Sequence, residues 1–258
     1  MKNLYYIDTH VHLNDEKIKA HLDEVINEAL ANKVEKMFVV GWDKESSIEA
    51  IKLSETYDFC YAIIGFHPCN IKGYGEAEFN WLDQALTHPK VVALGEIGYD
   101  FHWDTTTEEE QTSAFIKQLD LAVKHQKPVS IHSRDAAQIT FDVLKKYSDK
   151  LVGGVLHSYS GSVEMAKEYV KHGFILGISG PLTFKNARLN KEVVKNIDLK
   201  YLVSETDSPY LTPHPYRGQE NGPKYIPLIV SEIAAIKEIE MDIVTSQIID
   251  NVKRVFGV

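Results

Sequence analysis

The stretch Leu4-Tyr-Tyr-Ile-Asp-Thr-His-Val-His12 is a short apolar run that ends in two histidines. Residues 4–8 have the length and the composition of a buried β-strand. His10 and His12 are two residues apart, so on an extended backbone both imidazoles point to the same face and can converge on one ion. This stretch therefore predicts a strand whose end offers two nitrogen ligands to a metal.

Seven further strand-like runs follow along the chain. They span residues 36–40, 59–64, 91–94, 129–131, 152–156, 174–178 and 201–204. Most are continuously apolar, which is typical of buried parallel strands. Helical patterns lie between them, and Thr107 with Glu110 has the spacing of a capping box at the start of one helix. Alternation of this kind predicts an α/β fold, and eight repeats favour a TIM-type (β/α)8 barrel over an open sheet.

The length and composition of the chain indicate one globular domain, residues 1–258. Hydrophobic residues make up 44% and charged residues 25% of the sequence, the balance of a typical globular protein. No apolar run approaches the roughly 18 residues that a membrane helix needs, and Met1-Lys-Asn-Leu4 leads into a strand without a cleavable small-residue site. We therefore expect a cytoplasmic protein. Proline-rich residues 208–227 predict a long ordered loop after the last strand.

Cysteine content and net charge narrow the classes of function. The two cysteines, Cys60 and Cys69, provide neither a disulfide framework nor a thiolate zinc motif. A metal bound here must therefore use nitrogen and oxygen ligands. The net charge of −9 argues against a broad basic surface for nucleic acid, whereas a small anionic substrate held by metal ions remains compatible with it.

Reactive side chains gather at the expected carboxyl ends of the strands, where barrel enzymes place their active sites. A single histidine at a strand end is more often structural, but here several imidazoles and carboxylates share one rim. They are His10, His12, His67, Glu96, His132, His157, Glu205 and Asp207. Imidazole and carboxylate ligands without thiolate suit zinc, manganese or magnesium. The set predicts a metal site.

An ordered series of motifs resembles the TatD family of metal-dependent deoxyribonucleases, within the amidohydrolase-like barrels. Single members of the series are weak signals, whereas the ordered set spans nearly the whole chain and is specific. The motifs are Asp8-Thr-His-Val-His12, Gly65-Phe-His-Pro68, Gly95-Glu-Ile-Gly-Tyr-Asp100, His132-Ser-Arg-Asp-Ala136, His157-Ser-Tyr-Ser-Gly161, Glu205-Thr-Asp-Ser-Pro-Tyr-Leu211, Arg217 with Asn221-Gly-Pro223, and Asn251-Val-Lys-Arg-Val-Phe-Gly257.

The resemblance implies two divalent metal ions, of zinc, manganese or magnesium. It implies that His10, His12 and Asp207 bind one ion. It also implies that His132 and His157 bind the second. Glu96 would bridge the two ions, in the place where related amidohydrolases often have a carboxylated lysine.

Four residues receive expected roles in catalysis. Asp207 is the best candidate to accept the proton of the attacking water, because it would be both a ligand and a neighbour of the nucleophile. Glu205 is expected to orient a ligand histidine. Arg134 either holds a phosphate oxygen or forms an ion pair with a residue such as Asp135. His67 either reaches a phosphate or leaving group or only caps its turn.

The resemblance implies hydrolysis of phosphodiester bonds in DNA, in an exonuclease-like manner and with water activated by two metals. Single strands or ends are the expected substrate, because the acidic chain is poorly suited to bind long duplex. The alternative enzyme class is a metal-dependent ester hydrolase acting on D-aminoacyl-tRNA. A non-catalytic metal-binding scaffold is disfavoured, because such a protein needs no base like Asp207. Neither a membrane nor an obligate protein partner is expected.

Overall fold

The computed structural model describes residues 4–258. Residues 1–3, on which part of the expectation of a cytoplasmic protein rested, lie outside the described residues. Eight strands form one sheet in chain order, and each neighbouring pair is parallel. The strands are β1 (Tyr6–Val11), β2 (Val34–Val40), β3 (Cys60–Ile64), β4 (Val91–Asp100), β5 (Val129–Arg134), β6 (Gly154–Leu156), β7 (Phe174–Ile178) and β8 (Leu202–Ser204).

Side-chain hydrogen bonds join the first and last strands and bring the sheet almost to closure. The hydroxyl of Ser204 in β8 donates to the carbonyl oxygen of Ile7 in β1 at 2.9 Å. Thr9 donates in the other direction, to the carbonyl oxygen of Ser204 at 3.1 Å. The predicted TIM-type (β/α)8 barrel is confirmed.

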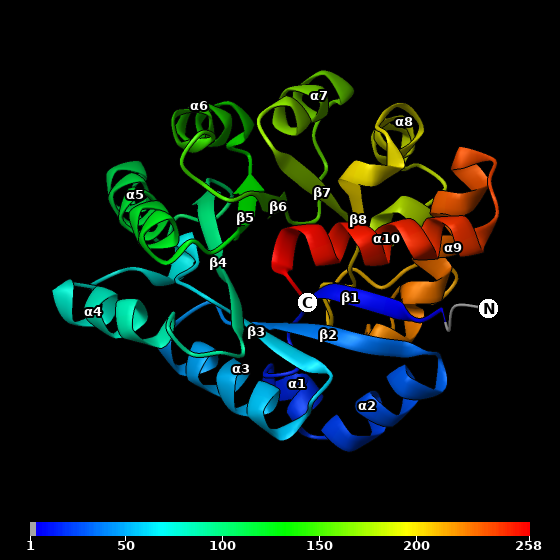
Figure 1. The fold of residues 1–258 in the computed structure, drawn as a ribbon, viewed down its shortest axis with the longest axis horizontal. Coiled ribbons are helices and arrows are strands. Elements are labelled where there is room, and N and C mark those ends of the chain that lie inside the picture. The colour runs from blue at the N-terminus through cyan, green and yellow to red at the C-terminus, as the bar shows by residue number, and fades with distance from the viewer. Residues whose placement is uncertain (1–3) are drawn as a thin grey trace.

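Helices surround the strands and cover the apolar outer face of the barrel (Figure 1). The helices are α1 (Glu16–Lys19), α2 (Leu22–Ala31), α3 (Lys44–Thr56), α4 (Glu76–Ala85), α5 (Glu108–His125), α6 (Ala137–Tyr147), α7 (Val163–Lys171), α8 (Arg188–Asn196), α9 (Ile226–Lys237) and α10 (Met241–Phe256). Near the end of α10, Phe256 packs on Phe38 of β2 with ring centroids 4.7 Å apart. This contact continues the hydrophobic core into the last helix.

Strand β4 is the largest departure from the expected boundaries. The apolar pattern placed its end at residue 94, but pairing with β5 continues from Ile97↔Ile131 to Asp100↔Arg134. Glycines and acids are poor strand formers, so local pattern could not predict this extension. Strand β1 likewise runs to Val11 instead of ending at residue 8. As a result, His10 and Glu96 lie within strands and not in the loops that follow them.

Local capping signals agree with the structure where they were clear. Thr107 and Glu110 form the predicted capping box at the start of α5, with the Glu110 carboxylate accepting from the Thr107 backbone N–H at 2.7 Å. The loop after β8 is ordered by Asn221, whose amide donates to the carbonyl of Thr206 at 2.9 Å. The loop is shorter than expected, because α9 begins at Ile226 and Pro227 belongs to its first turn.

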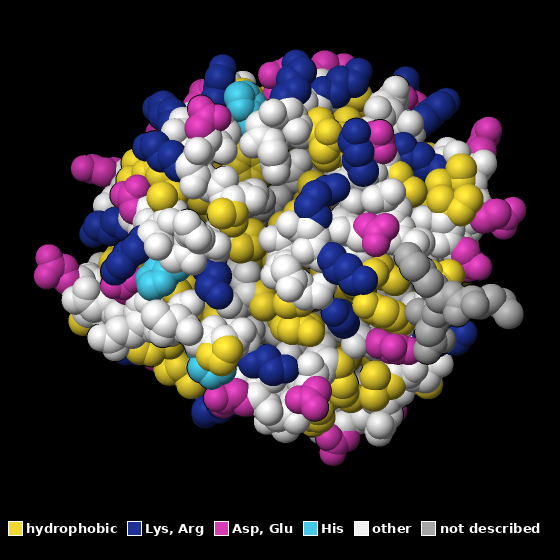
Figure 2. All heavy atoms as spheres, viewed as in Figure 1, with side chains coloured by type: hydrophobic (Ala, Val, Ile, Leu, Met, Phe, Trp, Pro, Cys, Tyr) yellow, Lys and Arg dark blue, Asp and Glu magenta, His cyan; other side chains and the backbone are white. Residues whose placement is uncertain are grey.

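The surface shown in Figure 2 carries positive and negative side chains interspersed with apolar ones. This face shows no broad basic area of the kind that holds duplex DNA by charge alone. Among the described helices, none is long and apolar enough to cross a membrane.

Candidate active site

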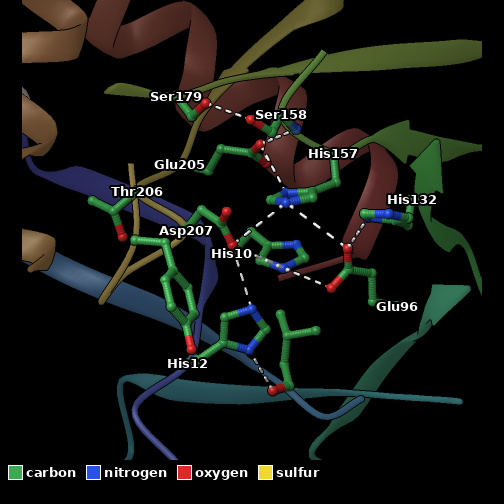
Figure 3. A network of polar contacts seen from close by, with 12 residues as sticks. His10, His12, Glu96, His132, His157, Ser158, Ser179, Glu205, Thr206 and Asp207 are labelled. Carbon is green, nitrogen blue, oxygen red and sulfur yellow. Dashed lines mark hydrogen bonds and ion pairs between the residues drawn. The ribbon is translucent and has the colours of Figure 1, made fainter. Parts of the chain in front are cut away.

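The six expected metal ligands lie together at the carboxyl ends of the strands, as Figure 3 shows. They come from β1, β4, β5 and the segments after β1, β6 and β8. The group consists of His10, His12, Glu96, His132, His157 and Asp207. Five of the six line a cleft of about 610 Å³, and His10 is fully buried beneath it.

Three of these residues surround one possible ion position together with an oxygen of Glu96. Nε2 of His12 lies 3.4 Å from Oδ1 of Asp207, and Nε2 of His10 lies 3.8 Å from the same oxygen. The second carboxylate oxygen of Glu96, Oε2, is 3.5 Å from Nε2 of His10. Two imidazoles and two carboxylates thus direct ligand atoms toward a common space.

The other oxygen of Glu96 faces a second pair of imidazoles. Oε1 is 2.7 Å from Nδ1 of His132 and 3.9 Å from Nε2 of His157. The ring of His157 also stacks on that of His10, with centroids 3.5 Å apart. Glu96 therefore lies between two groups of histidines, with one oxygen directed to each.

A hydrogen-bond acceptor holds the outer nitrogen of His12, and a carboxylate lies beside that of His157. Nδ1 of His12 donates to the carbonyl of Val40 at 3.1 Å, and Nδ1 of His157 lies 3.0 Å from Oε1 of Glu205. In His12 the proton is thus drawn to the outer nitrogen, so the inner nitrogen keeps its lone pair for a metal. Nδ1 of His157 forms no hydrogen bond within residues 4–258 despite the short distance to Glu205, so the orienting role of Glu205 stays a prediction.

Asp100 is a functional candidate to which the sequence analysis assigned no role. Its Oδ2 accepts from Nε2 of His132 at 2.9 Å, which directs Nδ1 of that histidine to Glu96. Asp100 and Glu96 are four residues apart on β4, a spacing that puts both side chains on the same side of a strand. That periodicity was the available signal, but it required knowing that β4 continues to residue 100.

Glycine in β7 provides the space for Glu205. A Cβ at Gly177 would come within 2.2 Å of Oε2 of Glu205. The backbone N–H of Ser158 donates to the same carboxylate, at Oε1, and the Ser158 hydroxyl meets that of Ser179 at 2.7 Å. Any larger residue at position 177 would displace the carboxylate that lies beside His157.

The charges in the cleft compensate one another. Burial alone would favour protonated carboxyls, but contacts with His157, His10 and His132 hold the pKa of Glu96 well below its usual value. Burial likewise opposes charge on His132, yet hydrogen bonds to Asp100 and Glu96 raise its pKa to about 9. The carboxylates are thus ionised at neutral pH, as metal ligands must be.

Nε2 of His10 supports a metal position most directly. This nitrogen is buried, is directed between Glu96 and Asp207, and has no hydrogen-bond partner within residues 4–258. A buried polar atom without a partner costs roughly 1–3 kcal/mol. A divalent ion would satisfy this atom, and the nitrogen and oxygen donors around it fit such an ion.

His67 differs from the other histidines in the direction of its hydrogen bond. Its Nδ1 accepts from the backbone N–H of Cys69 at 3.2 Å, so the proton of the neutral ring is on Nε2. Burial lowers the pKa of His67 to about 4, which keeps the ring neutral. Nε2 lies 4.0 Å from Oε1 of Glu96 and lines the cleft. His67 therefore offers an N–H donor to the cleft and not a free ligand nitrogen.

Arg134 stands at the outer edge of the cleft. Its side chain is exposed and its guanidinium carbon lies 5.8 Å from the centroid of the Trp103 ring. The neighbouring Asp135 pairs instead with His102 at 3.5 Å, and no carboxylate within residues 4–258 forms an ion pair with Arg134. The expected ion pair between Arg134 and Asp135 is therefore absent from the described residues, and a contact of Arg134 with phosphate stays a prediction.

Comparison with known proteins finds a matching family model and relatives that align over nearly the whole chain. A family model described as TatD related DNase matches residues 7–257. The Bacillus subtilis protein named uncharacterized metal-dependent hydrolase YabD is 43% identical over 251 residues, covering 97% of this chain and 98% of that protein. The Escherichia coli K12 protein named 3'-5' ssDNA/RNA exonuclease TatD is 32% identical over 257 residues, covering 97% and 98%.

Solved structures agree with the sequence comparisons. The crystal structure of YjjV, a TatD homologue of Escherichia coli K12, superimposes with a TM-score of 0.93 at 28% identity and covers 98% of both chains. A variant of the organophosphorus hydrolase of Deinococcus radiodurans matches with a TM-score of 0.66 at 12% identity, covering 99% of this chain and 94% of that one. The second likeness shows the barrel fold alone.

Proposed function

Because the chain belongs to the TatD family of metal-dependent hydrolases, we propose that it hydrolyses phosphodiester bonds at the ends of single-stranded nucleic acid, DNA above all. The family membership supports a hydrolase that needs a metal. The substrate class is supported by relatives that are named 3'-5' ssDNA/RNA exonuclease TatD.

The observation that carries the proposal is the position of Glu96 between two groups of imidazoles. One oxygen of Glu96 is directed to His10, and the other to His132 and His157. This arrangement suits two divalent ions, of zinc, manganese or magnesium, with Glu96 as the bridge. Bound there, the ions would activate water for attack and neutralise charge on the phosphate oxygens.

The side chains of the cleft have distinct tasks in this proposal. Asp207 accepts the proton of the attacking water, since its Oδ1 lies between the ligand nitrogens of His10 and His12. His67 donates its Nε2–H to a phosphate oxygen or to the leaving oxygen. Arg134 contacts the phosphate from the rim and keeps it in line.

A direct comparison of substrates tests the proposal. Metal-reconstituted protein is incubated side by side with end-labelled single-stranded DNA, the matching RNA, the matching duplex and D-aminoacyl-tRNA. We expect shortening of the single strands from an end, with DNA preferred over RNA and duplex degraded more slowly. Glu96→Ala protein, purified identically, controls for a contaminating nuclease.

Two outcomes would contradict this function. Rapid release of the amino acid from D-aminoacyl-tRNA without shortening of any oligonucleotide would assign the ester hydrolase chemistry instead. Full metal content without turnover of any of the four substrates would favour a binding or scaffold role.

A further inference from the structure

Two exposed aromatic rings flank the mouth of the cleft. Trp103, in the loop after β4, is 55% exposed, and Tyr210, in the loop after β8, is 47% exposed. Both rings line the cleft that contains the metal-ligand cluster. Strands β4 and β8 are four positions apart in a nearly closed ring of eight, so their loops lie on opposite sides of the mouth.

Exposure sets these rings apart from the aromatic residues of the core. Tyr99 and Phe115, close in sequence to Trp103, are almost completely buried. Large apolar groups left in solvent beside a polar cleft commonly mark a binding surface. Residues 4–258 contain no segment that covers the two rings, so a ligand of the same cleft is the natural occupant.

A cation accompanies each of the two rings. The guanidinium carbon of Arg134 lies 5.8 Å from the centroid of Trp103, and Nζ of Lys17 lies 4.9 Å from the centroid of Tyr210. The Tyr210 hydroxyl also donates to Oδ2 of Asp15 at 2.9 Å, which fixes the direction in which that side chain points. An aromatic face beside a positive charge is the combination that binds a base and its phosphate in single-stranded nucleic acid.

We propose that Trp103 and Tyr210 are stacking platforms for two bases on either side of the metal cluster. Arg134 and Lys17 then contact the phosphates of the same nucleotides. The strand thus crosses the mouth of the barrel from the β4 side to the β8 side. This inference rests on the proposed function and adds to it the reason for selecting unpaired strands.

The selectivity follows from the availability of base faces. In a duplex each base is stacked on its neighbours, so its faces are not free to meet an aromatic side chain. An unpaired strand can open its stack and place separate bases on separate rings. The protein can therefore discriminate against duplex without the broad basic surface that its charge of −9 disfavours.

Substitution of each ring tests the proposal. Loss of one stacking contact should reduce kcat/KM for single-stranded oligothymidylate roughly 5- to 150-fold in Trp103→Ala and in Tyr210→Ala. The loss should appear mainly in KM. Trp103→Phe and Tyr210→Phe keep an aromatic face and should retain most of the activity. Ile243→Ala, at a 55% exposed apolar residue of α10, is the matched control and should behave as wild type.

A small substrate separates stacking from chemistry. Bis(p-nitrophenyl) phosphate reaches the metal cluster without spanning the mouth, so both alanine variants should hydrolyse it within about twofold of wild type. A binding measurement completes the test. Quenching of tryptophan fluorescence by oligothymidylate, in an Asp207→Asn background with strongly reduced turnover, should be smaller in the Asp207→Asn, Trp103→Phe double variant, where Trp42 of the same cleft still contributes.

The outcomes distinguish this inference from the proposed function. If wild type degrades the oligonucleotide and both alanine variants match it, the rings do not bind bases and the inference fails alone. An equal loss on the oligonucleotide and on the small substrate would show that the variants damage the catalytic cluster, which also overturns the inference. Wild type that processes neither substrate would refute the proposed function itself.

Discussion

The buried cluster and the exposed rim of the same cleft are built in opposite ways. In the cluster, His12 and His132 are each held at one ring nitrogen by a fixed acceptor, and the other nitrogen is directed inward. On the rim, Arg134, Trp103 and Tyr210 are exposed. Tyr210 is held only at its hydroxyl, by Asp15, and its ring faces remain accessible. The difference teaches that ligand side chains are held in one orientation where the substrate would be hydrolysed. The exposed side chains of the rim can instead adjust to a flexible strand.

The largest expected effect is at the centre of the cluster. Glu96→Ala should remove or weaken both metal positions and reduce DNA hydrolysis to background, because Glu96 directs a different oxygen to each group of imidazoles. Elemental analysis of protein dialysed against metal-free buffer measures this. Glu109→Ala, at an exposed glutamate of α5, should keep its metal. A variant at position 96 that still holds two ions would exclude the bridging role.

Asp207 should separate chemistry from metal binding within the cluster. Asp207→Asn keeps the shape and one oxygen ligand but cannot accept a proton, so turnover should fall roughly 10²- to 10⁴-fold. Turnover, metal content and oligonucleotide affinity are measured on one preparation, because loss of metal alone would imitate a catalytic defect. Near-normal turnover with full metal would move the base function to another carboxylate, with Glu205 as the next candidate.

Substitution of Asp100 tests whether metal affinity depends on the orientation of the ligand His132 as well as on its presence. Asp100→Ala leaves Nε2 of His132 without its acceptor and should weaken metal binding roughly 10- to 100-fold. Competition with a chromophoric chelator measures the affinity. Asp100→Asn keeps an acceptor oxygen and should restore part of it. Equal affinity in all three proteins would mean that His132 is positioned by other contacts.

His67 lies between the two regions in both position and expected effect. His67→Ala removes an N–H donor to a charged oxygen, which should lower kcat roughly 10- to 150-fold, while His67→Gln keeps a donor and should lose less. Metal content should stay at the wild-type level in both variants, as elemental analysis can establish. Loss of an ion on substitution of His67 would show that Nε2 is a ligand and not a donor.

The smallest expected effect belongs to Arg134 on the rim. Arg134 is exposed, so its contact with phosphate is screened by solvent, and Arg134→Ala should raise KM for single-stranded DNA only about 3- to 10-fold. Metal content should be unchanged, kcat should fall by less than KM rises because the phosphate is held less well in line, and the dependence of KM on salt should become weaker. Arg134→Lys should lie between the two. A collapse of metal content in Arg134→Ala would instead make this residue part of the cluster.

Much of the architecture followed from sequence patterns that are local. Eight apolar runs with helical patterns between them were enough to predict the barrel, because burial of each strand depends on its own residues. Placement of His10 and His12 on one face needed only the period of a strand. The shared rim of the remaining ligands followed from the rule that parallel strands end on the same side.

Only the tertiary structure determined which hydrogen bonds the side chains of the site form and which atoms they direct into the cleft. The carbonyl of Val40, 28 residues from His12 in sequence, determines which nitrogen of His12 faces inward. Asp100, 32 residues from His132, does the same for His132. The extension of β4 that carries Asp100 arises from pairing with β5, against the local propensity of its glycines and acids. Trp103 and Tyr210 reach the same cleft only because the barrel closes. Residue type can therefore be read along the chain, whereas the direction of a hydrogen bond is set by partners that only folding brings near.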